Sequence, residues 1–182
     1  MHLNSKIIRS RRSVFPRQFN GGKIPKEILL EILENANYAP SHRMTQPWFF
    51  KIFSGLSKDN LMKAIINNEN ININEFAKDK LINNFSKTSH IICVCMLRNN
   101  IVPEWEEIAA TSMAVQNIWL SCVNRKIGGY WSTPSYIKYL DNFLNLKKDE
   151  RFLGFFYLGC YDDIEERNVV RKNFQEKLEL FD

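Results

Sequence analysis

The chain has 182 residues, of which 45% are hydrophobic and 13% aromatic, with a formal net charge of +5. This composition predicts one globular domain over residues 1–182 and argues against a disordered chain. No stretch approaches the roughly 20 apolar residues of a transmembrane helix, and charged residues interrupt the N-terminal segment. We therefore expect a cytoplasmic protein without a membrane partner.

The positive charge is spread along the chain. Lys and Arg alternate with Asp and Glu through residues 147–151 and 162–177. Nucleic-acid-binding domains gather their basic residues on one face or stripe, so we expect no nucleic-acid partner and keep that class only as a minor alternative. A modest positive field equally favours small phosphorylated ligands.

The first half of the chain predicts helices and loops before one short strand. Residues 3–12 predict a helix, and residues 13–24, with Pro, Asn and Gly, predict a loop. Pro25 suits the first turn of a second helix, whose apolar residues recur at helical spacing until Pro40 ends it. The aromatic residues 48–53 predict a strand.

Two further segments lie between this strand and the middle of the chain. Residues 57–68 have one apolar helical face, and the Asn-rich residues 67–76 predict a loop or a frayed helix end. Residues 90–97 form an apolar run of strand length. Residues 152–158 predict a central strand, and the tail over 163–182 is polar.

The longest predicted helix covers residues 104–125 and is apolar around most of its circumference. Such a helix should be buried, so in a chain of this size it indicates that a partner subunit covers part of it. Gly128 and Gly129 are expected to end this helix, as glycine does beyond a C-cap. Residues 130–132 would then begin a strand.

Cysteine and histidine patterns argue against a disulfide or a metal site. The four cysteines form no C-x-x-C pair, and Cys93 and Cys95 would share one face of a strand. We expect buried free thiols. The three histidines form no ligand pair on a helix, so we expect no metal.

Two short stretches contain the candidate ligand-binding residues. Arg11, Arg12 and Ser13 offer two guanidiniums and a hydroxyl, which suit a phosphate and polyol hydroxyls, although a solvated helix end explains them equally well. His42 and Gln46 lie on a Pro-punctuated loop that enters the strand at 48–53, where local hydrogen bonds are the alternative explanation. Each stretch is ambiguous when taken alone.

Four further stretches accompany these two, namely Val102–Glu106, Gly128–Ser132, Gly154–Gly159 and a basic segment around Arg171. No single stretch is specific. Together with Arg11–Ser13 and Ala39–Trp48, their order and spacing resemble the flavin-binding nitroreductase family, in its compact YdjA-like bacterial subgroup, over roughly residues 5–175.

The resemblance implies an α+β fold with a mostly antiparallel central sheet flanked by helices, in an intertwined homodimer. It implies two FMN sites at the dimer interface, each built from both subunits. Arg11, Arg12 and Ser13 would contact the flavin phosphate and ribityl chain, and His42 and Gln46 would contact the flavin of the partner subunit. A basic residue of the tail would grip the phosphate: Arg171, with Arg167 and Lys172 as alternatives.

The resemblance also places Trp131, Ser132 and Thr133 against the flavin and its phosphate. Here the chain departs from the subgroup, whose tryptophan is commonly followed by Arg, Ser or Thr, and Gly. This chain has Ser132 in place of that arginine and Pro134 in place of the glycine. Proline has no backbone N–H and a fixed φ, so contacts of this loop with a nicotinamide cofactor or a substrate are in question.

The function implied is FMN-dependent oxidoreduction, with NADH or NADPH as reductant and a nitroaromatic, quinone or similar small acceptor, in a ping-pong sequence. The flavin carries the chemistry, so we assign no catalytic side chain. The chain has no P-loop, Rossmann or serine-hydrolase motif. The altered loop motivates an alternative, a flavin-binding storage or sensing protein with little turnover.

Overall fold

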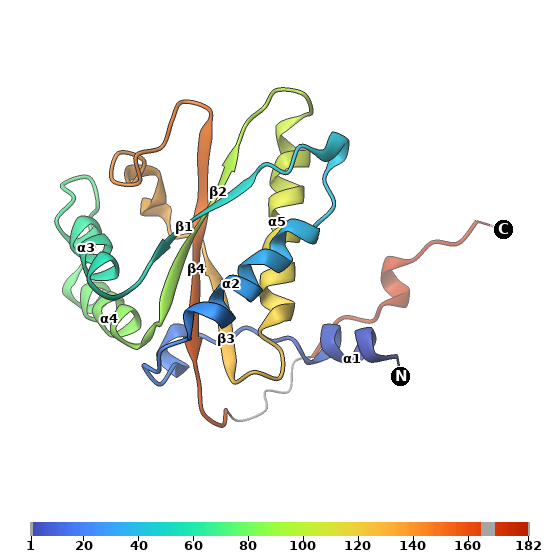
Figure 1. Ribbon diagram of the computed structural model, residues 1–182, viewed down its shortest axis with the longest axis horizontal. Coiled ribbons are helices and arrows are strands. Elements are labelled where there is room, and N and C mark those ends of the chain that lie inside the picture. The colour runs from blue at the N-terminus through green and yellow to red at the C-terminus, as the bar shows by residue number, and fades with distance from the viewer. Residues whose placement is uncertain (1, 165–169, 182) are drawn as a thin grey trace.

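The structure is a computed structural model that describes residues 2–164 and 170–181. Figure 1 shows one central sheet with helices on both of its faces. The elements in chain order are α1 (Leu3–Ser10), η1 (Pro16–Gln18), α2 (Lys26–Glu34), η2 (Asn35–Tyr38), η3 (His42–Met44), β1 (Trp48–Phe53), α3 (Gly55–Ile66), α4 (Glu75–Lys87), β2 (His90–Leu97), α5 (Glu104–Ser121), β3 (Ile127–Ser132), η4 (Ser135–Tyr139), β4 (Glu150–Cys160) and η5 (Gln175–Lys177).

The sheet has four strands in the order β1-β2-β4-β3, and every neighbouring pair is antiparallel. β2 and β4 therefore occupy the centre, as predicted for residues 152–158. The ranges predicted for β1 and β2 match the observed strands. The expected α+β fold with an antiparallel sheet flanked by helices is confirmed.

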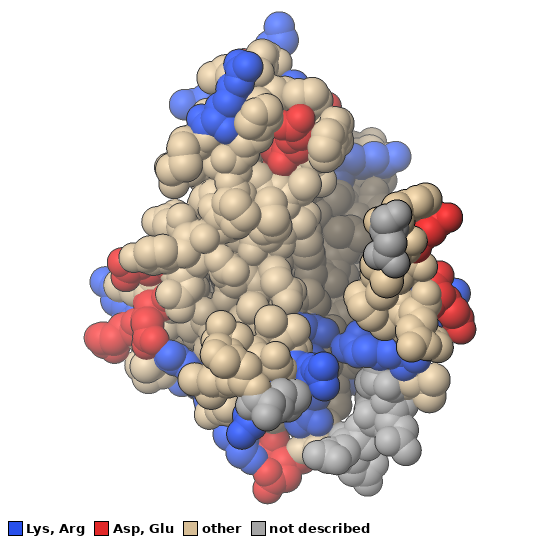
Figure 2. Space-filling model, turned by 90° about the vertical axis from the view of Figure 1, so that its right-hand side faces the viewer, with Lys and Arg blue, Asp and Glu red and all other residues tan. Residues whose placement is uncertain are grey.

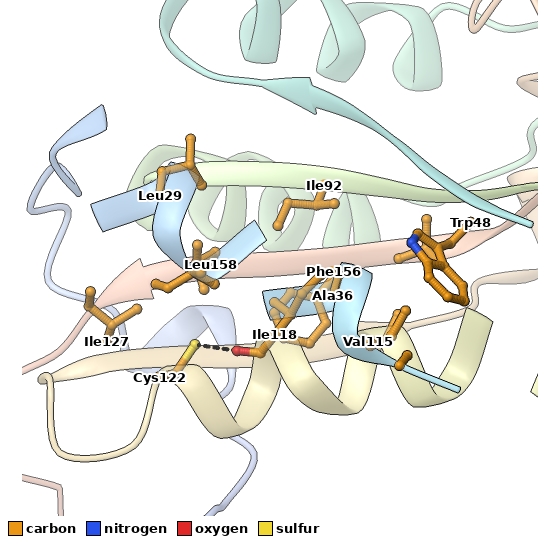
Figure 3. Packing of buried hydrophobic residues seen from close by; sticks show 14 of the residues in the cluster. Leu29, Ala36, Trp48, Ile92, Val115, Ile118, Cys122, Ile127, Phe156 and Leu158 are labelled. Atoms are coloured by element: carbon orange, nitrogen blue, oxygen red, sulfur yellow. Dashed lines mark hydrogen bonds between the residues drawn. The ribbon is translucent and has the colours of Figure 1, made fainter. Parts of the chain in front are cut away.

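Side chains alternate along the central strands and build one hydrophobic core on each face. Ile92 and Val94 point toward α2 and α5, where they meet Phe156 of β4 (Figure 3). Cys93 and Cys95 point to the opposite face, among the core residues of α3 and α4. The prediction that these two cysteines share one face and remain free is confirmed. With both faces covered, β2 is buried from Ile91 to Met96.

The end of the longest helix differs from the prediction. α5 ends at Ser121, and the chain turns through Asn124 and Lys126, both with positive φ. Gly128 and Gly129 lie inside β3, so the prediction that they end the helix was wrong. A Cβ on Gly129 would lie 2.3 Å from the Phe156 ring. Packing across the sheet, rather than a helix cap, is what requires glycine here.

One helix escaped the sequence analysis. α4 begins within the segment that we predicted to be a loop, where the Asn74 side chain accepts a hydrogen bond from the Ala77 N–H. Leu81 and Phe85 are its buried residues, and so few apolar positions make a weak periodic signal. α1 also ends earlier than predicted, at Ser10, because Arg11 already has extended backbone angles.

α5 is not covered on all sides within one chain. Ala110, Ala114, Val115 and Ile118 pack against the sheet. Its opposite face leaves large apolar side chains open to solvent, namely Trp105 (68% exposed), Ile108 (41%) and Met113 (40%). This unburied apolar face is the feature expected of a helix that meets a partner subunit. Across residues 2–164 and 170–181, no helix combines the length and apolarity needed to cross a membrane.

Candidate functional site

A groove of about 770 Å³ lies between α1, the second half of α5 and the C-terminal segment. Figure 2, which faces this side of the molecule, shows Lys and Arg side chains gathered at one end of a hollow. The groove has the volume of a typical cofactor pocket. Its lining residues are Ile8, Arg9, Arg11, Ser13, Gln116, Trp119, Arg171, Lys172 and Phe174.

Arg11 and Arg171 meet in this groove although they are far apart in sequence. Burial lowers the pKa of the half-buried Arg11, and the nearby Arg171 lowers it further. No carboxylate in the described part of the chain forms an ion pair with either arginine. Two neighbouring guanidiniums without an acidic partner favour the binding of an anion with several oxygens, such as a phosphate.

Ser13 is positioned by the sheet. It forms a parallel bridge with Gly129, and the next residue, Val14, donates its N–H to the Gly129 carbonyl at 3.1 Å. The loop that follows α1 is thereby attached to β3, and Ser13 lines the groove beside Arg11. Arg12 lies elsewhere, with its guanidinium 5.8 Å from the centre of the Tyr161 ring.

The structure places two of the three candidate tail residues in the groove. Arg171 and Lys172 both line the groove, while Arg167 lies outside the described residues. Two lining residues were missed, Gln116 and Trp119, because both had been read only as members of a buried helix. Their one sequence signal is that they lie three positions apart on α5, and therefore on one face.

His42 and Gln46 lie on a loop with unusual backbone angles. Arg43, Met44 and Gln46 all have positive φ, between 41° and 53°. Such angles are uncommon for residues other than glycine and cost about 1–3 kcal/mol each where the surroundings enforce them. Two hydrogen bonds that involve side chains support the loop: the Gln46 N–H donates to Ser41 Oγ at 3.1 Å, and His42 Nδ1 lies 2.6 Å from Glu106 Oε2.

The two sets of predicted residues do not meet within one chain. His42 contacts the first turn of α5 through Glu106, whereas Arg11 contacts Trp119 near the end of the same helix. At the rise of an α-helix these two contact points are about 20 Å apart. Within one chain, the His42 contact and the Arg11 groove therefore lie at opposite ends of α5.

Trp131 and Ser132 end β3, Thr133 follows directly, and none of the three lines this groove. Ser132 is three positions beyond Gly129, about 10 Å along the strand. The Trp131 indole Nε1 is buried and has no hydrogen-bond partner among the described residues. Pro134 follows as the residue that precedes η4, whose Tyr136 packs against Phe155 of β4 with the ring centres 6.5 Å apart.

Thiol and metal chemistry find little support in this fold. Burial raises the pKa of Cys95 and of Cys122 to about 12, so neither thiol ionises readily. Within the described ranges no group of three His, Cys, Asp or Glu residues could hold a metal ion. The site that the structure offers is a cationic groove with hydroxyl, amide and aromatic neighbours.

Comparisons with known proteins bear out the family resemblance and the fold. The model of the nitroreductase family matches residues 8–160. A Bacillus subtilis protein provisionally named NAD(P)H nitroreductase YfhC is 31% identical over 181 residues, which cover 93% of this chain and 92% of that protein.

Solved structures with the same fold include two that cover almost the whole chain. A nitroreductase-like family protein from Bacillus cereus has a TM-score of 0.85 at 26% identity and covers 100% of this chain and 97% of its own. A provisionally named nitroreductase from Desulfovibrio desulfuricans, solved in complex with FMN, has a TM-score of 0.78 at 21% identity and covers 100% and 99%.

Proposed function

Because this chain belongs to the nitroreductase family, we propose that it is an FMN-dependent oxidoreductase. In this proposal NADH or NADPH reduces the enzyme, and a small acceptor such as a nitroaromatic or a quinone then oxidises it again in a ping-pong sequence. The observation that carries the proposal is the meeting of Arg11 and Arg171 in a groove, without an acidic partner among the described residues.

The groove fits the phosphate end of FMN. Arg11 and Arg171 supply the charge that a phosphate needs, and Lys172 adds a third cation at the same groove. The Ser13 hydroxyl suits the ribityl hydroxyls or a phosphate oxygen. Arg12 points toward Tyr161 in the single chain, so we expect it to contribute less than Arg11.

The rest of the binding site requires a second copy of the chain. His42 and Gln46 lie about 20 Å from the Arg11 groove along α5, and the apolar outer face of α5 lies between them. A homodimer in which the two α5 helices pack antiparallel would bring His42 of one subunit toward Arg11 of the other. Figure 2 shows a broad uncharged surface on this side, as such an interface needs.

The roles of the protein's own residues follow from this arrangement. FMN, when bound, supplies the two-electron chemistry. Arg11, Arg171 and Ser13 bind and orient it by its phosphate and ribityl chain, and His42 and Gln46 reach it from the partner subunit. We assign no side chain as acid or base, because hydride transfer between a nicotinamide and a flavin does not require one.

Two measurements test the proposal. The purified protein should be yellow with a flavin absorption spectrum, and the colour should return when FMN is added to the apoprotein. The flavin-loaded protein should oxidise NADH or NADPH in the presence of a quinone, with parallel double-reciprocal lines. A colourless protein that does not take up FMN would contradict the proposal altogether.

The departure at Ser132 and Pro134 supports a second candidate, a flavin-binding storage or sensing protein with little turnover. The same assay separates the two. Flavin uptake without acceptor-dependent oxidation of NADH or NADPH would favour storage or sensing. Rapid oxidation would favour the enzyme, for which a cytoplasmic location remains our prediction.

A further inference from the structure

A short contact at the predicted site joins His42 and Glu106. His42 Nδ1 lies 2.6 Å from Glu106 Oε2. An ionised carboxylate can only accept a hydrogen bond, so Nδ1 must carry the proton. This contact leaves Nε2 as the ring nitrogen that is free to donate or to accept toward a ligand.

The contact ties a strained loop to a rigid helix. Glu106 belongs to the first turn of α5 and its side chain is only 21% exposed, whereas that of His42 is 58% exposed. The loop needs such a tie, because three of the four residues after His42 have positive φ. Strained backbone of this kind persists where neighbouring contacts enforce it, and it is concentrated at functional sites.

We infer that Glu106 is a positioning residue: it holds the His42 ring with Nδ1 protonated and directs Nε2 toward the cofactor of the partner subunit. This inference rests on the proposed function, in which His42 reaches the flavin site of a second copy. It adds a residue of α5 that does not itself touch the ligand. Within the loop, Ser41 Oγ accepts a hydrogen bond from the Gln46 N–H and so stabilises the same backbone conformation.

The neighbouring carboxylate of Glu104 forms an ordinary ion pair on the surface. Glu104, in the same first turn, lies 3.6 Å from Arg151 Nε, and both side chains are close to half exposed. Exposed pairs of this kind contribute little. Glu104→Ala is therefore a matched control: it removes an acidic side chain from the same helix end and leaves the His42 contact intact.

The first experiment examines the ring in the apoprotein. Proton–nitrogen correlation spectra of the imidazoles should show His42 protonated at Nδ1 in the wild type and in Glu104→Ala. The chain has only three histidines, so substitution of each assigns the signals. Glu106→Ala should release the ring to the mixture of tautomers typical of an exposed histidine. Unchanged His42 signals in Glu106→Ala would overturn the inference.

The second experiment measures FMN affinity of the apoproteins by fluorescence titration. We expect Glu106→Ala to bind FMN about tenfold more weakly, the effect of losing one charged hydrogen bond. Glu106→Gln should retain most of the affinity, because its amide oxygen can accept the same bond. If Glu106→Gln loses as much FMN affinity as Glu106→Ala, positioning by a hydrogen bond is overturned. If Glu104→Ala loses as much, the effect belongs to the negative charge at the helix end and the inference is likewise overturned.

These outcomes separate the inference from the proposed function. If the wild-type apoprotein binds no FMN, the proposed function fails, and the imidazole spectra still decide whether Glu106 orients His42. If His42→Ala weakens FMN binding while Glu106→Ala does not, the proposed function stands and the positioning role is wrong. Melting temperatures of all variants verify that each protein is folded.

Discussion

The guanidinium of Arg11 lies over the indole ring of Trp119, with its carbon 4.7 Å from the ring centre. Trp119 is itself held edge-to-face against Phe156 of β4, with the two ring centres 5.3 Å apart. A cation stacked on a fixed aromatic ring loses little freedom when it binds an anion. The sheet therefore positions Arg11 through Trp119.

Arg11 should dominate the recognition of the phosphate. Arg11→Ala is expected to weaken FMN binding at least about tenfold, because charge-assisted hydrogen bonds are lost. Riboflavin, which lacks the phosphate, should bind to the variant and the wild type with similar affinity. Arg12→Ala is the control, since Arg12 lies over Tyr161. Equal FMN affinities of wild type and Arg11→Ala in a fluorescence titration would rule out this assignment.

The ring of Trp119 should strengthen FMN binding because Arg11 stacks on its face. Trp119→Leu is expected to weaken FMN binding about three- to tenfold, which is the range of an exposed to a partly desolvated cation–π contact. Trp119→Phe keeps an aromatic face under Arg11 and should lose less. Both variants are compared by FMN titration and by melting temperature. A Leu variant that binds FMN as tightly as the Phe variant would show that the stacking does not contribute.

The exposed face of α5 should be the dimer interface. We expect a dimer that buries more than about 2,000 Å². Trp105→Glu places a charge on this face and should give a monomer by light scattering, with loss of bound flavin. Leu56→Glu is the control, because Leu56 is also exposed but belongs to α3 on the other face of the sheet. A wild-type monomer with flavin still bound would contradict the two-subunit site.

Ser132 should affect the choice of reductant. A hydroxyl cannot replace the charge-assisted bonds of the arginine that the family resemblance predicts here, so the wild type should discriminate poorly between NADH and NADPH. Ser132→Arg should raise kcat/KM for at least one of them with a fixed quinone acceptor. Unchanged values for both would mean that this loop does not touch the nicotinamide cofactor. A strong preference in the wild type would already contradict the premise.

His90 should make stability depend on pH. Burial lowers the pKa of His90 below its usual 6.5, and the nearby cation of Lys58 lowers it further. The unfolded chain then binds more protons than the folded one between the two pKa values, so the free energy of unfolding rises with pH in that window. This contribution is complete above about pH 6.5 and is lost as the pH falls toward the folded pKa.

Urea denaturation near pH 5 and near pH 7.5 measures this effect. The difference in unfolding free energy between the two conditions should be smaller in His90→Gln than in the wild type. An identical difference in both proteins would assign the pH dependence to carboxylates instead. Ser89, whose hydroxyl lies 3.0 Å from His90 Nδ1, is left unchanged in both.

Local patterns in the sequence were sufficient for much of the sheet. The apolar runs at 48–53 and 90–97 became β1 and β2 with the predicted bounds, because alternating burial on two faces selects such runs directly. The same alternation placed Cys93 and Cys95 on one face. The ends of the helices were predicted less well from the sequence, because α1 and α5 end where single residues change backbone angles.

Candidate residues of the site could be named from the sequence, but which of them the fold brings together could not. The residue types of Arg11 and Ser13 suited a phosphate, and the family resemblance added Arg171, yet only the fold brings the tail beside α1. Trp119 and Glu106 gained their roles from neighbours that are distant in sequence, Arg11 and His42. Side-chain chemistry is a local property of the chain, whereas proximity between remote segments depends on how the whole chain packs.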